Sequence, residues 1–324
     1  MRALLRTFAA TVFAGLVGAT SAAAETTLRL GHVLPANEIQ AEAAQLFADR
    51  VAELSDGAVK IQVFGGSALG NDRDMVEGLN IGTVDLWVGG AGVLTAASQT
   101  AAIFTVPFMF DELAQFQKVY DGEIGATISK RIAAESGHRI LAYWMRGPRW
   151  LTTKSRVDTP ADLKGLKIRV PDSPVFVRSW QQLGAAPSPM AFGEVFTALQ
   201  QGVIDGQENP LSLIYTARFS EVVDYLVKTQ HVLEPIVMVM SARRLKALDP
   251  KVQKVLLDAS NGKAKSFVAD RVTAGEEAFI KKLVDQGMTL VEVDKSLFQK
   301  RLEGFVEAEF PKIKDVHGMI RSAR

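Results

Sequence analysis

The sequence predicts an α/β protein of two lobes, each a β-sheet flanked by helices. Its length of 324 residues suits two domains better than one. In addition, two stretches share one order of elements. "VKIQVFGG" at 59–66 leads to "MVEGLNIGTVDLWVGG" at 75–90, and "LKIRVPDS" at 166–173 leads to "VFTALQQGVIDGQENP" at 195–210. Each stretch is typical of a strand, a helix ended by glycine and a second strand, which implies parallel pairing within two α/β units.

Three segments carry helix signals. Residues 34–57 place apolar side chains near helical spacing and end at a glycine. "TPADLKG" at 159–165 has a capping signature, with proline at the first helical position. Residues 249–287 open with Asp-Pro and keep apolar residues near helical spacing. This last pattern predicts one nearly continuous long helix, which Gly262 or Gly275 could divide.

The first 24 residues have the pattern of a cleaved export signal. Arg2 and Arg6 accompany an apolar stretch that is too short to span a membrane, and "AAA" satisfies the small-residue cleavage rule. We expect cleavage after Ala24 and a periplasmic location. No later apolar run reaches about 18 residues, so we expect no insertion into a membrane.

Composition argues against several classes of function. The chain contains no cysteine, which excludes disulfides, thiolate metal sites, a cysteine nucleophile and a lipid-anchored N-terminal cysteine. Without the two leader arginines, 35 basic residues face 36 acidic ones, and nothing indicates a nucleic-acid surface. The four histidines lack metal-ligand spacing, and neither a G-x-S-x-G elbow nor a phosphate-binding loop is found. We therefore expect no metal, no cofactor and no enzymatic activity.

Polar side chains gather near the predicted carboxyl ends of strands, where open parallel sheets bind ligands. Arg169 stands near the end of the strand in "GLKIRVP", and Asn209 near the end of the strand in "GVIDGQENP". An arginine fork and an amide together can hold a carboxylate. Each residue also has a plainer explanation: Arg169 as a solvated strand end, and Arg146 or Arg149 as the partner of a surface acid. The residues alone indicate an exported, two-lobed binder of an anionic ligand.

Several long motifs follow one another in a familiar order. The run from Arg149 to Pro210 includes "TPADLKGLKIRVP" and "LGAAPSPMAFGEVFTALQQGVIDGQENP", and "TQH" follows at 229–231. Upstream lie "GHVLP", "SALGNDRDMVEGLNIGTVDL" and "TVPFMF". With these motifs, most of the chain resembles the solute-binding proteins of tripartite ATP-independent periplasmic (TRAP) transporters, the DctP-type family. The resemblance implies a two-lobed periplasmic binding protein fold with a long helix spanning both lobes.

The resemblance also implies roles for individual residues. Arg169 corresponds to the family's principal carboxylate clamp, and Arg149 to its second arginine. Asn209 is expected to hydrogen-bond the same carboxylate, and Phe192 to pack on the ligand's apolar face. Asp72 matches a polar contact position known from the sialic-acid binders of the family.

The chain departs from the sialic-acid branch after the first Val-Asp strand, where that branch has an acidic residue and an arginine. Here the region holds small residues, including Gly90, so sialic acid is not expected. A C4-dicarboxylate, a sugar acid such as a uronate, and a hydroxy or keto acid remain open. We further expect Trp150, His32 and Gly90 to contact the ligand.

The two arginines are expected to differ in rigidity. Arg169 lies in a strand and should be preorganised, whereas Arg149 follows Gly147-Pro148 and should be held less firmly. Folding should survive the loss of either side chain.

The resemblance implies a periplasmic receptor that captures a small organic acid and delivers it to a TRAP membrane permease. We expect it to act as a monomer. The predicted lobes comprise 25–147 with 236–275, and 148–235 with 276–324, with the ligand cleft between them.

Two other functions compete with this one. An exported hydrolase could use Asp205 and Glu208 as acid and base. A ligand receptor for a two-component sensor would share the fold and the pocket.

Overall fold

The computed structural model describes residues 26–323, and the expected leader with its cleavage site after Ala24 lies outside them. The described residues form two sheets. The first has the order β2-β1-β3-β10-β4 and the second the order β11-β9-β5-β8-β6-β7. The strands of the first sheet are β1 (Thr26–Gly31), β2 (Val59–Phe64), β3 (Leu86–Gly90), β4 (His138–Trp144) and β10 (Ile236–Ser241). The strands of the second are β5 (Arg149–Thr153), β6 (Lys167–Val170), β7 (Ala186–Pro189), β8 (Gly206–Pro210), β9 (Tyr225–Val232) and β11 (Thr289–Val291).

In the first sheet, β1 is the central parallel strand. It pairs in parallel with β2 and with β3, while β10 runs antiparallel to both β3 and β4. Leu28 and Leu30 of β1 are fully buried, because helices cover this sheet. Helix α1 (Ile39–Leu54) packs against β2, α2 (Asp72–Ile81) against β3 and α4 (Glu123–Ser136) against β4.

The second sheet explains why the predicted stretch at 166–210 is longer than the one at 59–90. β6 and β8 are neighbours and run parallel, as the pattern predicts. Between them, however, the chain adds helix α5 and strand β7, which pairs with β6 at the edge of the sheet. In the first lobe, by contrast, β2 and β3 are separated by β1.

The helices are α1 (Ile39–Leu54), α2 (Asp72–Ile81), α3 (Leu113–Asp121), α4 (Glu123–Ser136), α5 (Pro174–Leu183), α6 (Val195–Gln200), α7 (Leu211–Thr216), α8 (Ala242–Ala247), α9 (Pro250–Asn261), α10 (Lys263–Asp285), α11 (Lys295–Arg301), α12 (Phe305–Glu309) and α13 (Lys314–Ser322). The helix predicted over 34–57 thus begins later, at Ile39. The capping signature at 159–165 produces a short 3₁₀ helix, Pro160–Leu163, with the Thr159–Asp162 capping box formed.

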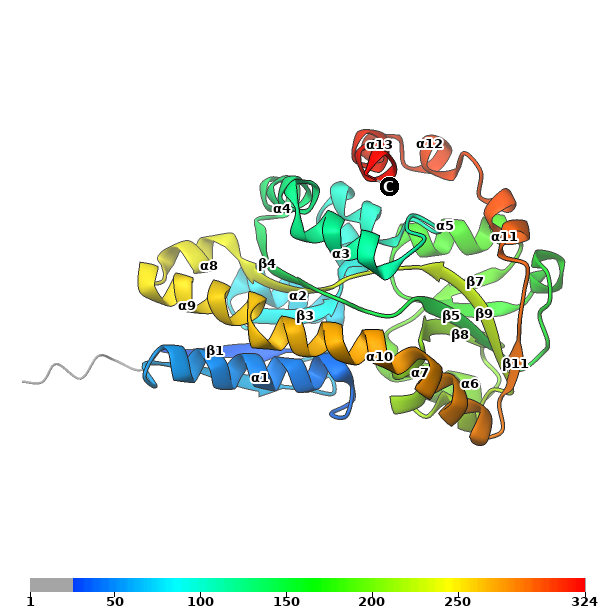
Figure 1. Cartoon of the computed structure of the whole chain (residues 1–324), viewed down its shortest axis with the longest axis horizontal. Helices are drawn as coiled ribbons and strands as arrows, with labels where there is room; N and C mark the ends of the chain where they lie inside the picture. Colours follow the sequence, from blue (N-terminus) through cyan, green and yellow to red (C-terminus); the bar gives the residue numbers. More distant parts are fainter. Residues whose placement is uncertain (1–25, 324) are drawn as a thin grey trace, which may run out of the picture.

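The long helix predicted over 249–287 is divided once. Gly262 separates α9 from α10, because its backbone leaves the helical region. Gly275 lies inside α10, which continues without a break to Asp285. α10 packs on α1 and β4 of the first lobe and on α7 and β11 of the second, so it spans both lobes (Figure 1).

The chain also crosses between the sheets in two extended segments. Residues 145–148 connect β4 to β5, and residues 233–235 connect β9 to β10. β4 and β10 belong to the first sheet, and β5 and β9 belong to the second.

The structure differs from the predicted lobes at the C-terminus. The prediction placed all of 276–324 in the second lobe, but α13 packs on α4 of the first lobe. Arg131 on α4 donates to Asp315 at 2.5 Å across this contact. α13 therefore lies against the first lobe, above α4 in Figure 1, whereas α11 packs on α5 and β9 of the second lobe.

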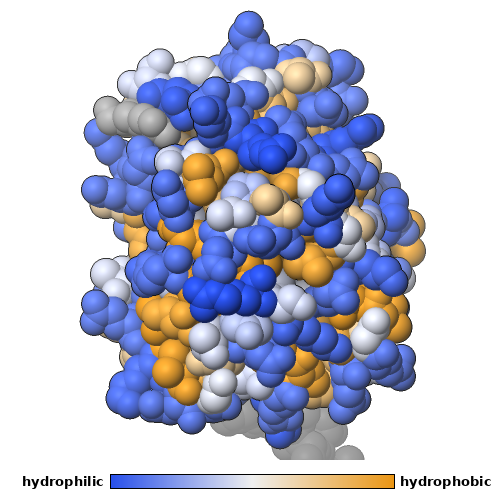
Figure 2. Space-filling model, turned by 90° about the vertical axis from the view of Figure 1, so that its right-hand side faces the viewer, coloured by the Kyte–Doolittle hydropathy of each residue, from blue (hydrophilic) through white to orange (hydrophobic). Residues whose placement is uncertain are grey.

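No helix among residues 26–323 is long and apolar enough to cross a bilayer. Figure 2 shows one end face of the molecule, on which hydrophilic residues dominate and hydrophobic ones form small separate groups.

Gly206 on β8 offers a test of the second sheet. A Cβ atom at this position would lie 2.5 Å from the backbone oxygen of Thr152 and 2.8 Å from Cγ2 of Thr153. Because backbone cannot move aside easily, Gly206→Ala should lower the free energy of unfolding by about 1–3 kcal/mol. Chemical denaturation measures this loss. Gly318→Ala, which would place Cβ in open space on α13, is the control and should not destabilise the protein. Equal stability of both variants would contradict the tight β5–β8 contact.

Candidate ligand site between the lobes

A cavity lies between the two lobes, next to the crossing segments 145–148 and 233–235. It is small in this arrangement of the lobes, with a volume of about 50 Å³. Among the predicted site residues, those in its lining are Asp72, Gly90, Arg149, Arg169, Phe192 and Asn209.

Arg169 is buried and does not form a solvated strand end. Its side chain lines the cavity, and the residue is only 3% exposed. Nε and Nη2 both donate to the backbone oxygen of Met190, at 2.9 and 2.6 Å, which fixes the plane of the guanidinium. Among residues 26–323 no carboxylate lies within ion-pair distance of it, although Glu208 and Asp72 are near enough to act on its charge. Burial lowers the pKa of Arg169 to about 10, and the repulsion from Arg149 adds to this effect.

Arg149, in contrast, is fully engaged by protein carboxylates. Its Nε and Nη2 form a fork on the carboxylate of Glu208, with Nη2 at 2.7 Å from Oε1. Nη1 donates to Oε2 of Glu234 at 3.1 Å, and the guanidinium lies 5.0 Å from the ring centre of Phe176. Burial alone would lower the pKa of Arg149, but Glu208 and Glu234 outweigh it and raise the pKa. The expectation that Arg149 is held loosely is therefore wrong.

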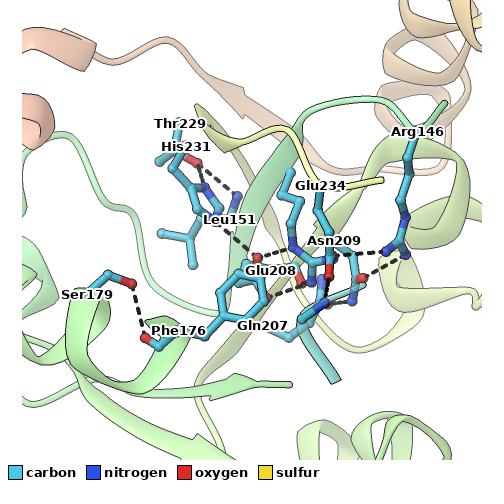
Figure 3. A network of polar contacts seen from close by, with 12 residues as sticks. Arg146, Leu151, Phe176, Ser179, Gln207, Glu208, Asn209, Thr229, His231 and Glu234 are labelled. Carbon is cyan, nitrogen blue, oxygen red and sulfur yellow. Dashed lines mark hydrogen bonds and ion pairs between the residues drawn. The ribbon is translucent and has the colours of Figure 1, made fainter. Parts of the chain in front are cut away.

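A neutral histidine completes the partners of Glu208. Nε2 of His231 lies 3.0 Å from Oε2 of Glu208, and Nδ1 lies 2.8 Å from Oγ1 of Thr229. Thr229 accepts from the backbone N–H of Leu151, so its hydroxyl hydrogen is free to be donated to Nδ1. Burial lowers the pKa of His231, more than Glu208 raises it. His231 therefore donates from Nε2 to Glu208 as a neutral ring (Figure 3).

This geometry removes the basis for a hydrolytic carboxylate pair. Burial would raise the pKa of Glu208, but Arg149 and His231 hold it at about 2, so the carboxylate stays ionised and fully hydrogen-bonded. Asp205 immediately precedes Gly206, the first residue of β8. Its side chain accepts from the backbone N–H of Lys167 at 2.8 Å. The two acids therefore do not face one another across a substrate.

Glu234 and Arg146 are parts of the site that the sequence prediction did not assign. Both line the cavity from the crossing segments. Oε1 of Glu234 accepts from the backbone N–H of Gly92 at 2.8 Å, and a Cβ at Gly90 would lie 3.0 Å from this oxygen. The glycines at and just after the end of β3, Gly90 and Gly92, thus make room for Glu234. The only sequence signal for Arg146 was its place beside Arg149 in "MRGPR", and Glu234 had none.

Asn209 lies at the centre of a chain of amides. Its Nδ2 donates to Oε1 of Gln207 at 2.6 Å, and Nε2 of Gln207 donates to Oγ1 of Thr152 at 2.7 Å. Its Oδ1 accepts from Nη2 of Arg146 at 3.4 Å (Figure 3). These bonds fix which end of the Asn209 amide carries the oxygen.

Asp72 brings a carboxylate to the cavity from the start of α2. Its Oδ1 accepts from Nε1 of Trp87 at 2.9 Å. Gly89 leaves room for this pair, because a Cβ there would lie 2.1 Å from the Trp87 ring. Burial raises the pKa of Asp72 to about 6, and the Trp87 bond and the charges of Arg169 and Arg146 offset only part of the rise.

Trp150 and His32 do not belong to the cavity lining. Trp150 follows Arg149 on β5, so its side chain points to the opposite face, into the core of the second lobe, where Nε1 donates to Glu276 at 3.1 Å. His32 is buried against Gly65, whose hypothetical Cβ would lie 2.8 Å from the ring. Both residues pack the protein.

The lobes also touch each other around the cavity. Leu34 and Ala41 of the first lobe form an apolar cluster with Leu213 of the second, and Phe192 packs against it. At the exposed rim, Arg73 donates to Asp172 at 3.0 Å.

A buried contact lies behind this cluster. The carboxylate of Glu38, just before α1, accepts from Ser212 at 2.7 Å and from Thr216 at 2.6 Å, both on α7. This contact joins the two lobes through hydrogen bonds that are shielded from water.

A larger cavity lies elsewhere, between residues 106–111 and the C-terminal helices. Its lining contains none of the three arginines described above. Charged side chains of both signs surround it, including Glu303, Glu307, Lys314 and Arg321. It therefore lacks the arrangement for holding an anion that the cavity between the lobes has.

Asp72 should make stability depend on pH. Its pKa is about 6 in the folded protein against an ordinary value of 3.8, so the folded state holds a proton that the unfolded state releases. The stabilising contribution of the neutral carboxyl is present below about pH 4 and is lost as the pH rises through about 6. Asp72→Asn should therefore be more stable than the wild type above pH 6, with a difference that shrinks toward pH 4. Thermal unfolding across this range measures it, and a difference that does not vary with pH would contradict the assignment.

Comparison with known proteins identifies the family of this chain. Residues 30–311 match the model of the family described as bacterial extracellular solute-binding protein, family 7 (DctP). The chain is 38% identical to the solute-binding protein RD1_1052 of Roseobacter denitrificans over 291 residues, 90% of this chain and 89% of that protein. The crystal structure of RD1_1052 with bound L-galactonate has a TM-score of 0.87 to this one and covers 92% of this chain and 98% of its own.

Two further relatives bind chemically similar ligands. The 2,3-diketo-L-gulonate-binding periplasmic protein YiaO of Escherichia coli is 33% identical over 94% of this chain and 92% of its own. A TRAP periplasmic solute-binding protein of Polaromonas sp. JS666, bound to D-erythronate, is 35% identical with a TM-score of 0.85, and covers 91% of this chain and 98% of its own. Because the family model spans most of the chain and several relatives match nearly end to end, the chain belongs to family 7 of the bacterial extracellular solute-binding proteins, the DctP-type receptors of TRAP transporters.

Proposed function

We propose that this receptor captures a hydroxylated monocarboxylic acid, a sugar acid of the aldonate type or a similar hydroxy or keto acid, and delivers it to a TRAP permease. One observation carries the proposal. Arg169 is a buried guanidinium in the cavity, oriented by Met190, with no carboxylate partner among residues 26–323. Because Nε and Nη2 share one acceptor, the fork between Nη1 and Nη2 is left for a ligand carboxylate.

The charges around the cavity favour one carboxylate in the ligand. Glu208 and Glu234 lie in ion pairs with Arg149 and Arg146, so those charges are already opposed. Arg169 is the remaining guanidinium of the lining. A second ligand carboxylate would meet Glu234 or Asp72 instead of a cation, and like charges in a buried site are costly. This argument disfavours a C4-dicarboxylate.

The rest of the lining suits a ligand with hydroxyl groups on one side. Asp72 and Asn209 offer acceptor oxygens, and an amide N–H adds a donor. Phe192, Leu34 and Val93 supply apolar contacts. Sugar acids have this character, with hydroxyls that need partners and C–H faces that pack on apolar side chains. The relatives' ligands L-galactonate, D-erythronate and 2,3-diketo-L-gulonate are of this class.

Binding is proposed to be coupled to closure of the lobes. Arg169 belongs to the second lobe and Asp72 to the first, so one ligand that touches both favours the arrangement in which they face each other. The Arg73–Asp172 pair and the cluster around Leu213 can form only in that arrangement. A ligand shifts the lobes toward closure only through contacts that the open arrangement lacks.

Three finer points complete the proposal. The receptor is exported with cleavage after Ala24, acts as a monomer, and catalyses no reaction. The engagement of Glu208 by Arg149 and His231 supports the last point, because it leaves no carboxyl there to exchange a proton.

The carboxylate requirement can be measured directly. Calorimetry with L-galactonate and D-erythronate, and with their neutral amides, should show binding of the acids and a loss of at least about 30-fold for the amides, because the amide cannot neutralise Arg169. Equal affinity for acid and amide would refute the clamp. Binding of succinate more tightly than either sugar acid would refute the argument for one carboxylate.

Arg169 and Arg149 should respond differently to substitution. Arg169→Ala should weaken binding by about 30-fold to several thousand-fold with little change in stability, because no protein carboxylate loses its partner. Arg169→Lys should also bind poorly, since an ammonium cannot reproduce the fork. Arg149→Met should lower the free energy of unfolding by about 3–5 kcal/mol, because Glu208 and Glu234 stay buried without it.

The controls for these variants lie on the same chain. Arg178→Ala, at an exposed arginine on α5, should change neither quantity. Adding Glu208→Gln to Arg149→Met should recover part of the stability, because it removes the buried carboxylate that has lost its guanidinium partner, whereas Glu234 keeps Arg146 and the Gly92 N–H. Calorimetry and denaturation together decide. A stable Arg149→Met protein, or wild-type binding by Arg169→Ala, would contradict these assignments.

A further inference from the structure

We propose that Arg146 recognises the oxygen on carbon 2 of the ligand, so that the receptor selects 2-hydroxy and 2-keto acids over acids without that oxygen. The inference rests on the proposed function, since it takes Arg169 and Asn209 as the partners of the ligand carboxylate. It goes further by assigning a specificity role to a third arginine.

Arg146 is buried in the cavity with unused donors. The residue is 5% exposed, and its Nε has no hydrogen-bond partner among residues 26–323. Its two contacts are both long, 3.4 Å from Nη1 to Glu234 and 3.4 Å from Nη2 to Asn209. The neighbouring Arg149 makes its bonds to Glu208 and Glu234 at 2.7 and 3.1 Å. A buried guanidinium with long contacts and a free Nε can gain more from a ligand than a saturated one can.

The position of Arg146 points to a particular atom. Its Nη2 approaches the side-chain oxygen of Asn209, as Figure 3 shows, and Asn209 is assigned to the ligand carboxylate. A donor beside a carboxylate-binding amide faces the next ligand atom along the chain. In an acid this atom is carbon 2 with its substituent.

The chemistry of arginine defines which substituent fits. A guanidinium only donates hydrogen bonds, so it pairs with an oxygen that accepts. A hydroxyl oxygen and a keto oxygen both accept, whereas a methylene hydrogen does not. Arg146 would therefore bind 2-hydroxy and 2-keto acids alike, whereas a 2-deoxy acid would leave one of its N–H donors without an acceptor. Leaving a buried charged donor without its partner costs binding free energy.

Neighbouring residues hold Arg146 for this role. Glu234 contacts it on one side and is itself fixed by the backbone N–H of Gly92 and by Arg149. Because Glu234 has these other partners, it does not depend on Arg146. Removal of the Arg146 side chain therefore strands no carboxylate, in contrast to removal of Arg149.

The experiment compares paired ligands on paired proteins. The ligands are D-erythronate with 3,4-dihydroxybutanoate, and L-galactonate with its 2-deoxy counterpart. The proteins are the wild type, Arg146→Met, Arg146→Lys and the exposed control Arg178→Met, each checked for folding by circular dichroism and thermal unfolding. Calorimetry gives the affinity ratio of each 2-hydroxy acid to its 2-deoxy partner.

We expect the wild type and Arg178→Met to prefer the 2-hydroxy acid by about 10- to 100-fold. Arg146→Met should reduce this ratio to within about threefold, mainly by weakening the 2-hydroxy acid. Arg146→Lys should keep part of the ratio, because one donor remains. Loss of affinity for both partners by the same factor would overturn the proposal and would assign Arg146 to the carboxylate instead. A ratio unchanged in Arg146→Met would overturn it too.

Failure of the proposed function has a different signature. If the wild type binds none of the four acids, or binds them no better than their amides, the carboxylate clamp fails and the inference with it. If the wild type binds both members of a pair equally well but rejects the amides, the clamp holds and only the role of Arg146 is wrong.

Discussion

The rest of the site depends on the buried ion cluster formed by Arg149, Glu208 and Glu234. It lies where the crossing segments 145–148 and 233–235 join the lobes, and it links β5, β8 and the second crossing segment through hydrogen bonds of 2.7–3.1 Å. Two carboxylates and one guanidinium would be costly to bury apart, but each is satisfied by the others, by His231 and by the Gly92 N–H. The cluster therefore fixes the point about which the lobes meet, and Arg146 contacts it through Glu234.

Three arginines line one cavity, yet their partners separate them into different roles. Arg149 is paired with two protein carboxylates, and the contact with the ligand that the family resemblance implies for it stays a prediction. Arg169 has a backbone carbonyl that orients it and no carboxylate partner among residues 26–323, so its charge is available. Arg146 has two long contacts and an unused Nε. The pKa values agree with this division. Burial lowers the pKa of Arg146 and that of Arg169 to about 10, whereas Glu208 and Glu234 raise the pKa of Arg149. The number of partners, more than the residue type, indicates which arginine a ligand can use.

Much of the fold could be predicted from sequence because its signals are local. The period-2 pattern of "KIRV" and the capping box at Thr159 act within a few residues, and both elements form where expected. The position of the break at Gly262 rather than Gly275 could not be predicted, because both are glycines within one apolar pattern. Trp150 was predicted to contact the ligand because the sequence does not show which face of β5 is turned toward the cavity. In the structure its side chain lies in the core of the second lobe. Glu234 had no signal at all, since its partners Gly92, Arg146 and Arg149 lie 85 or more residues away along the chain.

The end of β3 and the crossing segment 233–235 meet beside the cavity. The residues at the end of β3 are small, and Glu234 and the Asp72–Trp87 pair occupy the space beside them. In the sialic-acid branch, by the resemblance, an acidic residue and an arginine occupy this region. Here the carboxylate of Glu234, on the crossing segment 233–235, lies in this region and contacts Arg146. The side chains of Phe192 and Leu34 line the cavity together with these polar groups. On the proposed assignments, the carboxylate and the oxygen on carbon 2 are recognised by charged and amide side chains, whereas the remainder of the ligand packs on apolar ones.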